Sequence, residues 1–327
     1  MPLLLKESHL RELLTMRDLV PLMERALADL SAGSVVQPVR TAIPVEAHGG
    51  VLFLMPAYLR EQGGLGLKAV TLFPGNAVRG LPTHLATVLL IDAETGALRA
   101  VLDGRLLTEM RTGAVSAAAT KHLARRDAKV LALLGAGVQA RGHLEALREV
   151  RPFAELRVWT RTKEKAERFA DEAARRFAVR AAAAESAEDA VRGADVVCTL
   201  TASQTPVLRG RWLGPGTHIN AVGAPRPDWR EMDTEAVARA QVFVDSRAAA
   251  VVEAGDLVAP LKEKTITEAH IVAEIGEVFA GRHPGRTDTS HITLFKSVGL
   301  AVEDVATAQF AYEQARARQV GDEFSLD

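Results

Sequence analysis

A tight glycine turn ahead of a helical stretch is the feature of this chain that most constrains its fold. The segment Gly135-Ala-Gly137-Val-Gln-Ala140 follows an apolar run and has the spacing G-x-G-x-x-A. Gly135 permits the turn, Gly137 leaves the backbone open to a close neighbour, and Ala140 lets the new helix pack against a sheet. The backbone N–H groups that begin this helix, at Val138 and Gln139, would face the phosphates of a dinucleotide.

The pattern around this turn alternates between strand-like and helical runs, which predicts βαβ units and a parallel sheet. The strand-like runs are Lys129–Leu134, Leu156–Trp159, Asp195–Thr201, His218–Val222 and Gln241–Val244, and the helical runs are 138–149 and 163–176. The Ala-rich stretch 181–184 is interpreted as helix surface or a loop edge. Such turns also join strands to helices for packing alone, but the strand–turn–helix context favours a dinucleotide site.

The residues after the second strand indicate which dinucleotide is preferred. An NAD site usually offers a carboxylate there, ~20 residues beyond the glycines, to the ribose 2′-hydroxyl. This chain has Arg161 and Thr162 in that place, and Glu164 comes later. Charge-assisted hydrogen bonds from Arg161 and Thr162 would suit a 2′-phosphate. We therefore expect NADPH rather than NADH, although Arg161 and Lys163 could also simply solvate a loop.

The residues before 105 have a different pattern. Extended runs over 35–45, 51–58, 66–73, 85–91 and 98–102, with a turn at Asp92–Gly96, predict a mostly antiparallel sheet containing a hairpin. Helical spacing of apolar residues follows over 106–125 and again over 297–318. The last helix is expected to fold back on the first domain and make that domain discontinuous.

Composition excludes several classes of protein. The formal net charge is −1 with mixed signs, which argues against a nucleic-acid or anionic-membrane binder. The chain contains a single cysteine, Cys198, and its nine histidines show no metal-ligand spacing, so no disulfide framework or metal site is expected. No apolar run reaches the ~20 residues of a membrane helix, and the early charges at the N-terminus do not fit a signal peptide. We expect a cytoplasmic protein.

Segments distributed over almost the whole chain resemble the ornithine cyclodeaminase/mu-crystallin family. The matching segments, in order, are Gln37–Thr41, Met55–Tyr58, Leu67–Val70, Gly80–Pro82, Ala86–Leu90, Leu107–Ser116, Gly135–Ala140, Gly193–Asp195, Ile219–Ala224, Val244–Ser246, Glu274–Glu277 and Phe295–Ser297. The segment Arg226–Glu231 resembles most the mu-crystallin branch, whose members reduce cyclic ketimines with NADPH.

The resemblance implies an α/β fold of two domains. One is a Rossmann-type, doubly wound parallel-sheet domain for the dinucleotide, over residues 125–295. The other is a discontinuous α+β sheet domain, 1–124 with 296–327, which binds the substrate and dimerises. Exposed β-rich strands need covering, which also favours a homodimer.

The resemblance also implies a basic substrate site. A ketimine acid offers a carboxylate beside a C=N bond, and Arg40, Lys68 and Arg111 are the cations that would hold this carboxylate. From pattern alone each of them reads as a surface charge. Lys68, with its pKa lowered by burial and by its basic neighbours, would pass a proton to the nitrogen. Thr112, next to Arg111, is assigned to the cofactor site.

Two further residues are candidates with open alternatives. The family's cyclodeaminases carry a catalytic aspartate where alignment of Pro227 places Pro225, which cannot relay a proton, so ornithine deamination is disfavoured. Asp228 is the replacement candidate for a catalytic carboxylate, or else a turn or N-cap residue. His84 is a candidate substrate-binding residue, or a structural histidine beside a turn.

The leading hypothesis is NADPH-dependent reduction of a cyclic imino acid of the pyrroline- or piperideine-2-carboxylate type. The alternatives are reductive amination of a 2-oxo acid, as in the family's alanine dehydrogenases, ornithine cyclodeamination, and non-catalytic binding of a small molecule.

Overall fold

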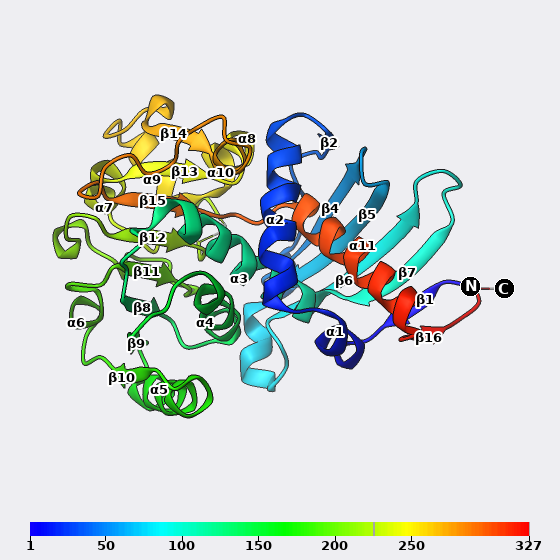
Figure 1. Ribbon diagram of the computed structural model, residues 1–327, viewed down its shortest axis with the longest axis horizontal. Coiled ribbons are helices and arrows are strands. Elements are labelled where there is room, and N and C mark those ends of the chain that lie inside the picture. Colours follow the sequence, from blue (N-terminus) through cyan, green and yellow to red (C-terminus); the bar gives the residue numbers. More distant parts are fainter. Residues whose placement is uncertain (225, 327) are drawn as a thin grey trace. The chain divides into compact units, whose positions relative to one another are not determined.

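The computed structural model describes residues 1–224 and 226–326, which form two compact units. The first comprises Met1–Arg111 and Leu300–Asp327, and the second comprises Thr112–Gly299. Two sheets, one in each unit, organise the chain, and the α/β class expected from the sequence is confirmed (Figure 1). Each unit is described by itself.

The sheet of the first unit is largely antiparallel and runs in the order β16-β1-β7-β6-β5-β4-β2, with β3 paired to β4. Its strands are β1 (Leu3–Leu5), β2 (Val35–Val36), β3 (Thr41–Val45), β4 (Gly50–Leu59), β5 (Gly64–Leu72), β6 (His84–Asp92), β7 (Leu98–Asp103) and β16 (Asp322–Glu323). The predicted hairpin joins β6 to β7, and Asp92 accepts the N–H groups of Glu94 and Thr95 in its turn. β1 pairs with β7 in parallel, which the sequence did not indicate.

Helices cover one face of this sheet because the strands alternate between buried and half-buried residues. α2 (Met16–Ser31) and α11 (Ala301–Arg318) pack against each other, and α11 crosses β4, β5 and β6 (Figure 1). α1 (Glu7–Leu13) precedes them. A Cβ at Gly66 of β5 would lie 2.5 Å from the carbonyl oxygen of Leu89 in the neighbouring strand β6, so a larger residue there would disturb the pairing of the two strands. The return of the last helix to the first unit is as expected from the sequence.

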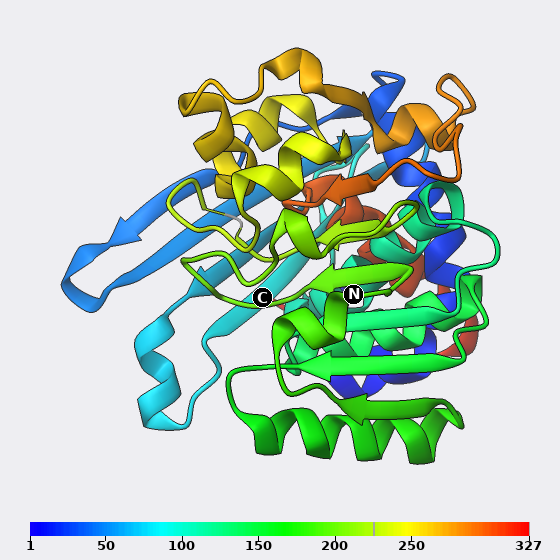
Figure 2. The same ribbon diagram turned by 90° about the vertical axis from the view of Figure 1, so that its left-hand side faces the viewer.

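In the part of the second unit that the structure describes, eight strands form a parallel sheet in the order β10-β9-β8-β11-β12-β15-β13-β14 (Figure 2). The strands are β8 (Val130–Leu134), β9 (Glu155–Trp159), β10 (Arg180–Ala183), β11 (Val196–Thr199), β12 (His218–Ala221), β13 (Gln241–Val244), β14 (Ile271–Glu274) and β15 (Thr293–Lys296). Its central strands are buried on both faces, as parallel strands between helices must be.

The helices of the second unit are mostly short. They are α4 (Val138–Val150), α5 (Lys163–Phe177), α6 (Ala187–Val191), α7 (Thr234–Arg239), α8 (Arg247–Glu253), α9 (Gly255–Lys262) and α10 (Ile275–Phe279). α3 (Gly104–Leu123) and α4 lie on one side of the strands and α6 on the other, which confirms the doubly wound arrangement (Figure 1).

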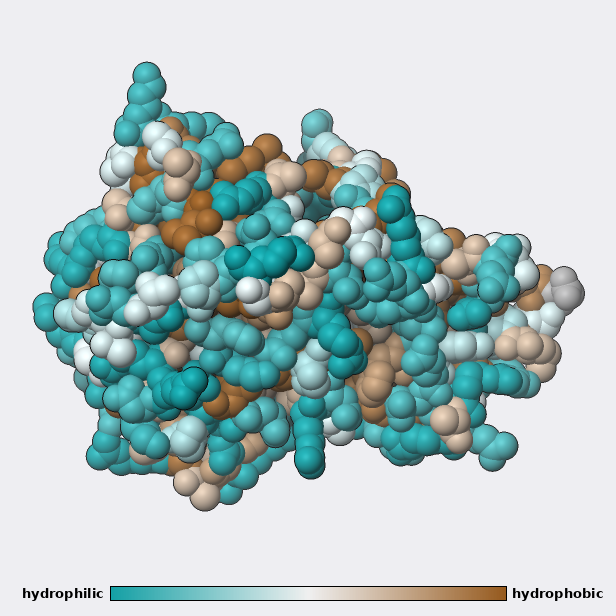
Figure 3. All heavy atoms as spheres, turned by 45° about the horizontal axis from the view of Figure 1, so that its top comes forward, coloured by the Kyte–Doolittle hydropathy of each residue, from teal (hydrophilic) through white to brown (hydrophobic). Residues whose placement is uncertain are grey.

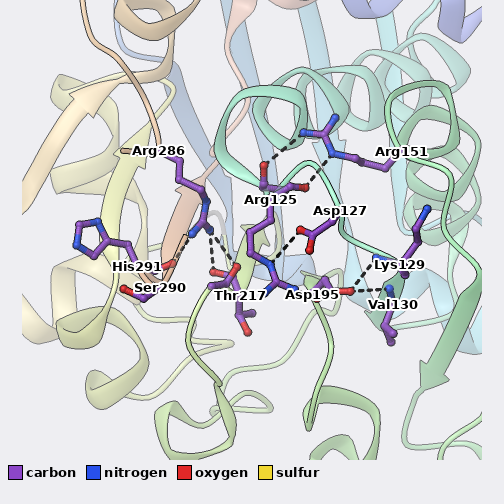
Figure 4. Close-up of polar contacts among 12 residues, drawn as sticks. Arg125, Asp127, Lys129, Val130, Arg151, Asp195, Thr217, Arg286, Ser290 and His291 are labelled. Atoms are coloured by element: carbon purple, nitrogen blue, oxygen red, sulfur yellow. Dashed lines mark hydrogen bonds and ion pairs between the residues drawn. The ribbon is translucent and has the colours of Figure 1, made fainter. Parts of the chain in front are cut away.

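Two arginines fix the C-terminal end of α3 (Figure 4). Arg151 donates to the carbonyls of Thr120, Lys121, Ala124 and Arg125, and Arg286 donates to that of Leu123. The last carbonyls of a helix have no partner within it, and the helix dipole favours cations there. Nearby, Asp195 accepts the N–H groups of Lys129 and Val130 and pairs with Arg125, which holds the start of β8 to the same end.

Several boundaries differ from the sequence-based expectations. Residues 35–45 form two strands rather than one run, because Pro38 lacks the N–H that a continuous strand needs. Residues 180–183 form the edge strand β10, not helix surface or a loop, and its small side chains lie against α5. The last helix starts at 301 rather than 297, after Gly299 with its positive φ of 77°.

The division between the units also lies elsewhere than the sequence suggested. It cuts α3 between Arg111 and Thr112, whereas the boundary was placed at 124/125, and the second boundary is 299/300 rather than 295/296. The first turns of α3 belong with the first unit because Arg111 bonds to Asp304 of α11.

The face of the molecule in Figure 3 is largely hydrophilic, with hydrophobic residues gathered in small separate groups. Among the described residues, no helix has the length and apolar character needed to cross a bilayer.

Candidate functional site

A buried lysine occupies the middle of the first unit's sheet. Lys68 lies in β5 between Met55 of β4 and Val88 of β6, and only 2% of it is exposed. Its Nζ pairs with Asp304 Oδ2 of α11 at 2.6 Å. A lysine is rarely buried to this extent unless it is paired, because losing water disfavours the charged form. The sequence alone indicates a surface lysine here, whereas the structure places Lys68 in the core.

Arg111 joins the same cluster from α3. It is 4% exposed, its Nε donates to Asp304 Oδ1 at 3.0 Å, and its Nη1 pairs with Glu303 Oε2. Glu303 and Asp304 are fully buried and lie in the first turn of α11, where the helix dipole favours negative charge. Two cations and two carboxylates therefore share one buried site.

Burial sets the protonation of this cluster. Desolvation by burial, together with the charges of Arg111 and Arg40, lowers the pKa of Lys68 to about 8, although attraction to Asp304 opposes this shift. The pKa of Arg111 is raised above its ordinary value because attraction to Asp304 and Glu303 outweighs its own desolvation. Arg111 is thus a permanent cation, and Lys68 is an ammonium group that can release its proton near neutral pH.

His84 and Arg40 belong to the same electrostatic surroundings. His84 begins β6, and burial together with the charges of Lys68 and Arg111 lowers its pKa to about 4, so its imidazole is neutral at pH 7. Arg40 precedes β3, its guanidinium lies 5.7 Å from the ring centroid of Phe53, and its charge acts on Lys68. The structure thus gathers Lys68, Arg111, His84 and Arg40 in one unit.

Glu303 and Asp304 are site residues that sequence reasoning missed. They follow Leu300-Ala-Val at the start of a helix whose next residues are small or apolar. Two adjacent carboxylates at the start of a buried helix are the available signal, because ionised groups in such a place need partners.

A second candidate site is a cavity of about 250 Å³ at the glycine turn of the second unit. The cavity is lined by the glycine turn and by residues at the ends of β9 and β11. The lining residues are Gly135, Ala136, Gly137, Trp159, Thr160, Arg161, Lys165, Leu200, Thr201, Ala202, Ser203 and Val207. In open parallel sheets ligands bind outside the carboxyl ends of the strands, and this cavity lies at those ends.

The two glycines of the turn have separate roles. Gly135 has a φ of +120°, and a Cβ there would lie 2.7 Å from the carbonyl oxygen of Leu200, so only glycine fits. A Cβ at Gly137 would meet nothing within 4 Å, so this glycine keeps space open above the start of α4. Ala140, near the start of α4, is fully buried. The open backbone and the cations Arg161 and Lys165 fit the pyrophosphate and 2′-phosphate of a dinucleotide.

The other predicted cofactor residues do not line this cavity. Val138 begins α4 and is 50% exposed, and the buried side-chain oxygen of Gln139 has no hydrogen-bond partner among the described residues. Thr162 is the N-cap of α5, and Thr112 is buried in α3. Lys165, Thr201 and Ser203 line the cavity without having been predicted.

Asp228 does not line the cavity at the glycine turn. Its side chain is 59% exposed and pairs with Arg226 at 3.1 Å, and it is part of the second unit rather than the unit of Lys68. Pro225, which aligns with the cyclodeaminases' aspartate, lies outside the described residues.

Metal binding has no evident site in the part of the chain that the structure describes. No three His, Cys, Asp or Glu side chains of residues 1–224 and 226–326 are grouped to hold an ion. Cys198 is fully buried in β11, and burial raises its pKa to about 12, so it behaves as a packing residue.

Comparison with known proteins covers nearly the full chain. The chain is 46% identical over 298 residues to the rat (Rattus norvegicus) ketimine reductase mu-crystallin, covering 90% of this chain and 91% of that one. It superposes on the Thermococcus litoralis Delta(1)-pyrroline-2-carboxylate reductase, solved with NADH and L-proline, with a TM-score of 0.96 and 43% identity, covering 98% of this chain and all of that one.

An archaeal alanine dehydrogenase dimer with bound NAD is also similar, with a TM-score of 0.94, 36% identity, and coverage of 100% of this chain and 99% of that one. The family profile described as ornithine cyclodeaminase/mu-crystallin matches residues 2–319. On this evidence the chain belongs to the ornithine cyclodeaminase/mu-crystallin family.

Proposed function

We propose that this protein is a nicotinamide-dependent reductase that converts a cyclic ketimine acid, of the pyrroline- or piperideine-2-carboxylate type, to the cyclic amino acid. The observation that carries the proposal is the buried cluster of Lys68, Arg111, Glu303 and Asp304 beside His84 and Arg40. Its support comes also from the relatives, which are a ketimine reductase and a pyrroline-2-carboxylate reductase.

The overall reaction takes one hydride and one proton. The C=N bond becomes CH–NH when a hydride adds to the carbon and a proton reaches the nitrogen. The reduced dinucleotide, when bound, supplies the hydride and leaves oxidised.

The chain's own residues hold the acid and supply the proton. Arg111, kept charged by its two carboxylates, offers a planar guanidinium to the substrate carboxylate, and Arg40 adds a second cation. Lys68 holds a proton on Nζ with a pKa of about 8, near the pH at which a general acid works best. His84, whose imidazole is neutral at pH 7, is the remaining proposed substrate-binding residue. Asp228 is kept as a candidate carboxylate of the second unit.

The test is oxidation of NADPH with a panel of substrates. We expect turnover with the cyclic imino acids, little with 2-oxo acids plus ammonia, and none with ornithine. A preference for 2-oxo acids plus ammonia would instead establish an alanine-dehydrogenase-type activity, which the similar archaeal structure makes the second candidate. Tight dinucleotide binding without turnover of any substrate would establish a binding protein and overturn the proposal.

NADPH is the proposed cofactor, and Arg161 is the proposed reader of its 2′-phosphate. Arg161 lines the cavity beside Lys165, and the described lining contains no carboxylate that would repel the phosphate. The variant Arg161→Ala should weaken NADPH binding about tenfold to a hundredfold, since hydrogen bonds to a charged group contribute ~1.5–3 kcal/mol. Binding of NADH, which has no 2′-phosphate, should change little. Equal losses for both dinucleotides would assign Arg161 a structural role.

We also propose a homodimer that acts in the cytoplasm. The sheet face opposite α11 presents half-buried and exposed apolar residues such as Leu54, Leu67, Leu85 and Leu89, and contiguous apolar patches on monomers are usually small. The similar alanine dehydrogenase was solved as a dimer. Light scattering of Leu89→Asp should give a monomer if this face is the interface, and cell fractionation would test the location.

A further inference from the structure

A buried acidic cluster lies at the carboxyl ends of the parallel strands, outside the residues used so far. Glu231, Asp256 and Lys296 are each fully buried. Lys296 ends β15, Gly223 follows β12, and Thr201 follows β11. These strand ends form the edge of the sheet where dinucleotides bind in such folds.

Glu231 is tied to the wall of the dinucleotide cavity. Its Oε1 accepts the N–H and the Oγ1–H of Thr201, both at 2.6 Å, and Thr201 lines the cavity together with Gly135 and Gly137. The other oxygen, Oε2, is buried and has no hydrogen-bond partner among the described residues. A Cβ at Gly223 would collide with this oxygen, so the close approach requires glycine.

The ammonium group of Lys296, beside Glu231, is already paired with Asp256. Asp256 accepts the N–H groups of Glu231 and Met232 on Oδ1, at 2.8 and 2.9 Å, and pairs through Oδ2 with Lys296 Nζ at 3.0 Å. Lys296 also donates to the carbonyl of Gly223. The charged groups facing Glu231 are thus Asp256 of α9 and Lys296 of β15, so two carboxylates share one ammonium group.

This imbalance affects the protonation of Glu231. Burial and the charge of Asp256 raise its pKa to about 7, against the opposing effects of Lys296 and of the hydrogen bonds from Thr201. At lower pH the cluster holds one extra proton and is neutral, and at higher pH it carries one negative charge.

We propose that Glu231 is a positioning residue that holds the Thr201 wall of the cavity and links one proton to the oxidation state of the bound dinucleotide. This inference rests on the proposed function. The oxidised nicotinamide ring is a cation and the reduced ring is neutral. A carboxylate ionised in low-dielectric surroundings favours the cation, whereas its protonated form does not distinguish the two rings.

The test compares the dissociation constants of NADP⁺ and NADPH, without substrate, by titration calorimetry from about pH 6 to about pH 8.5, a range that spans the pKa of Glu231. The 2′-phosphate is common to both ligands, so its titration cancels in their ratio. As pH rises, we expect the ratio of the NADP⁺ constant to the NADPH constant to fall about tenfold in the unmodified protein. In Glu231→Gln, which keeps the acceptor for Thr201 but cannot ionise, the ratio should not change with pH.

Two further variants keep the test decisive. Thr201→Val removes a hydrogen bond to the ionised form, so the change in the ratio should move to higher pH; this variant also serves if Glu231→Gln does not fold. Glu167→Gln, on the exposed side of α5, is the matched control and should behave like the unmodified protein.

A ratio that does not change with pH in the unmodified protein, or one that still changes in Glu231→Gln, would overturn the inference alone. A protein that binds neither dinucleotide would overturn the proposed function as well.

Discussion

The two units each bury a lysine–aspartate pair, yet the group whose pKa shifts is the lysine of the pair in the first unit and a neighbouring carboxyl group in the second. In the first unit Lys68 pairs with Asp304 at 2.6 Å, and in the second Lys296 pairs with Asp256 at 3.0 Å. The first pair has the cations Arg111 and Arg40 nearby, and there the pKa of the lysine falls. The second has Glu231 nearby, and there it is the additional carboxylate whose pKa rises.

The comparison teaches that the ion pair itself does not decide which group titrates. Burial penalises every charge, and the sign of the charge in excess decides which group changes its protonation near pH 7. In the first unit that group is a proton donor beside the proposed substrate site. In the second it is a proton acceptor behind the dinucleotide cavity.

The largest expected effect comes from removing the donor. Lys68→Met should lower turnover of the imino acid by roughly 10²–10⁴-fold, the usual contribution of a general acid. Binding of NADPH should change less than about threefold, since the cavity belongs to other residues. Steady-state kinetics and calorimetry measure the two quantities, with Lys262→Met on the surface as the control. Near-normal turnover would remove Lys68 from the mechanism.

The free energy of unfolding should depend more on Lys296 than on Lys68, which is the reverse of their expected effects on turnover. Lys296→Met leaves Asp256 and Glu231 buried without a cation and should lower the free energy of unfolding by about 3–5 kcal/mol. Lys68→Met should cost less, because Arg111 still bonds to Asp304. Denaturant unfolding at fixed protein concentration measures both. A larger loss for Lys68→Met would contradict this account of the excess charge.

The free energy of unfolding should change with pH because the pKa of Glu231 differs between the folded and the unfolded chain. Its folded pKa of about 7 lies above its ordinary value of 4.5, so between these values the folded chain keeps a proton that the unfolded chain releases. The free energy of unfolding should therefore fall as pH rises through this window, by roughly 3 kcal/mol. Glu231→Gln lacks this component, so unfolding curves of the two proteins should diverge with pH; parallel curves would contradict the raised pKa.

The smallest expected effect is a shift in a pH profile. If Lys68 donates the proton, turnover should decline above about pH 8, where Lys68 loses its charge. Asp304→Asn removes the carboxylate that favours the ammonium form, so the decline should begin about one pH unit lower or more. The exposed Asp171→Asn serves as the control. A shift to higher pH would contradict the assignment of Lys68.

The sequence predicted the fold best where local chemistry decides it. The glycine turn at 135–140, the hairpin turn at Asp92 and the alternating strands of the second unit all have local signals, and all are present. The parallel pairing of β1 with β7 and the edge strand β10 depend on partners far along the chain, which residue patterns do not specify.

The site was predicted less completely, for the same reason. Lys68 and Arg111 entered through the family resemblance, while their own surroundings suggested surface residues. What makes them buried is Asp304 and Glu303, which lie about two hundred residues away in sequence but bond to them directly. Glu231 is a similar case, since only the fold shows that Lys296 is already engaged by Asp256.

The return of α11 to the first sheet also has a consequence for synthesis. The counter-charges of Lys68 and Arg111 are the last part of the cluster to leave the ribosome, since they lie in residues 300–327. Until then the nascent first unit has two cations and no carboxylate to accompany them into a core. Its folding must wait until α11 has been made, and by then every strand of the second sheet is already present.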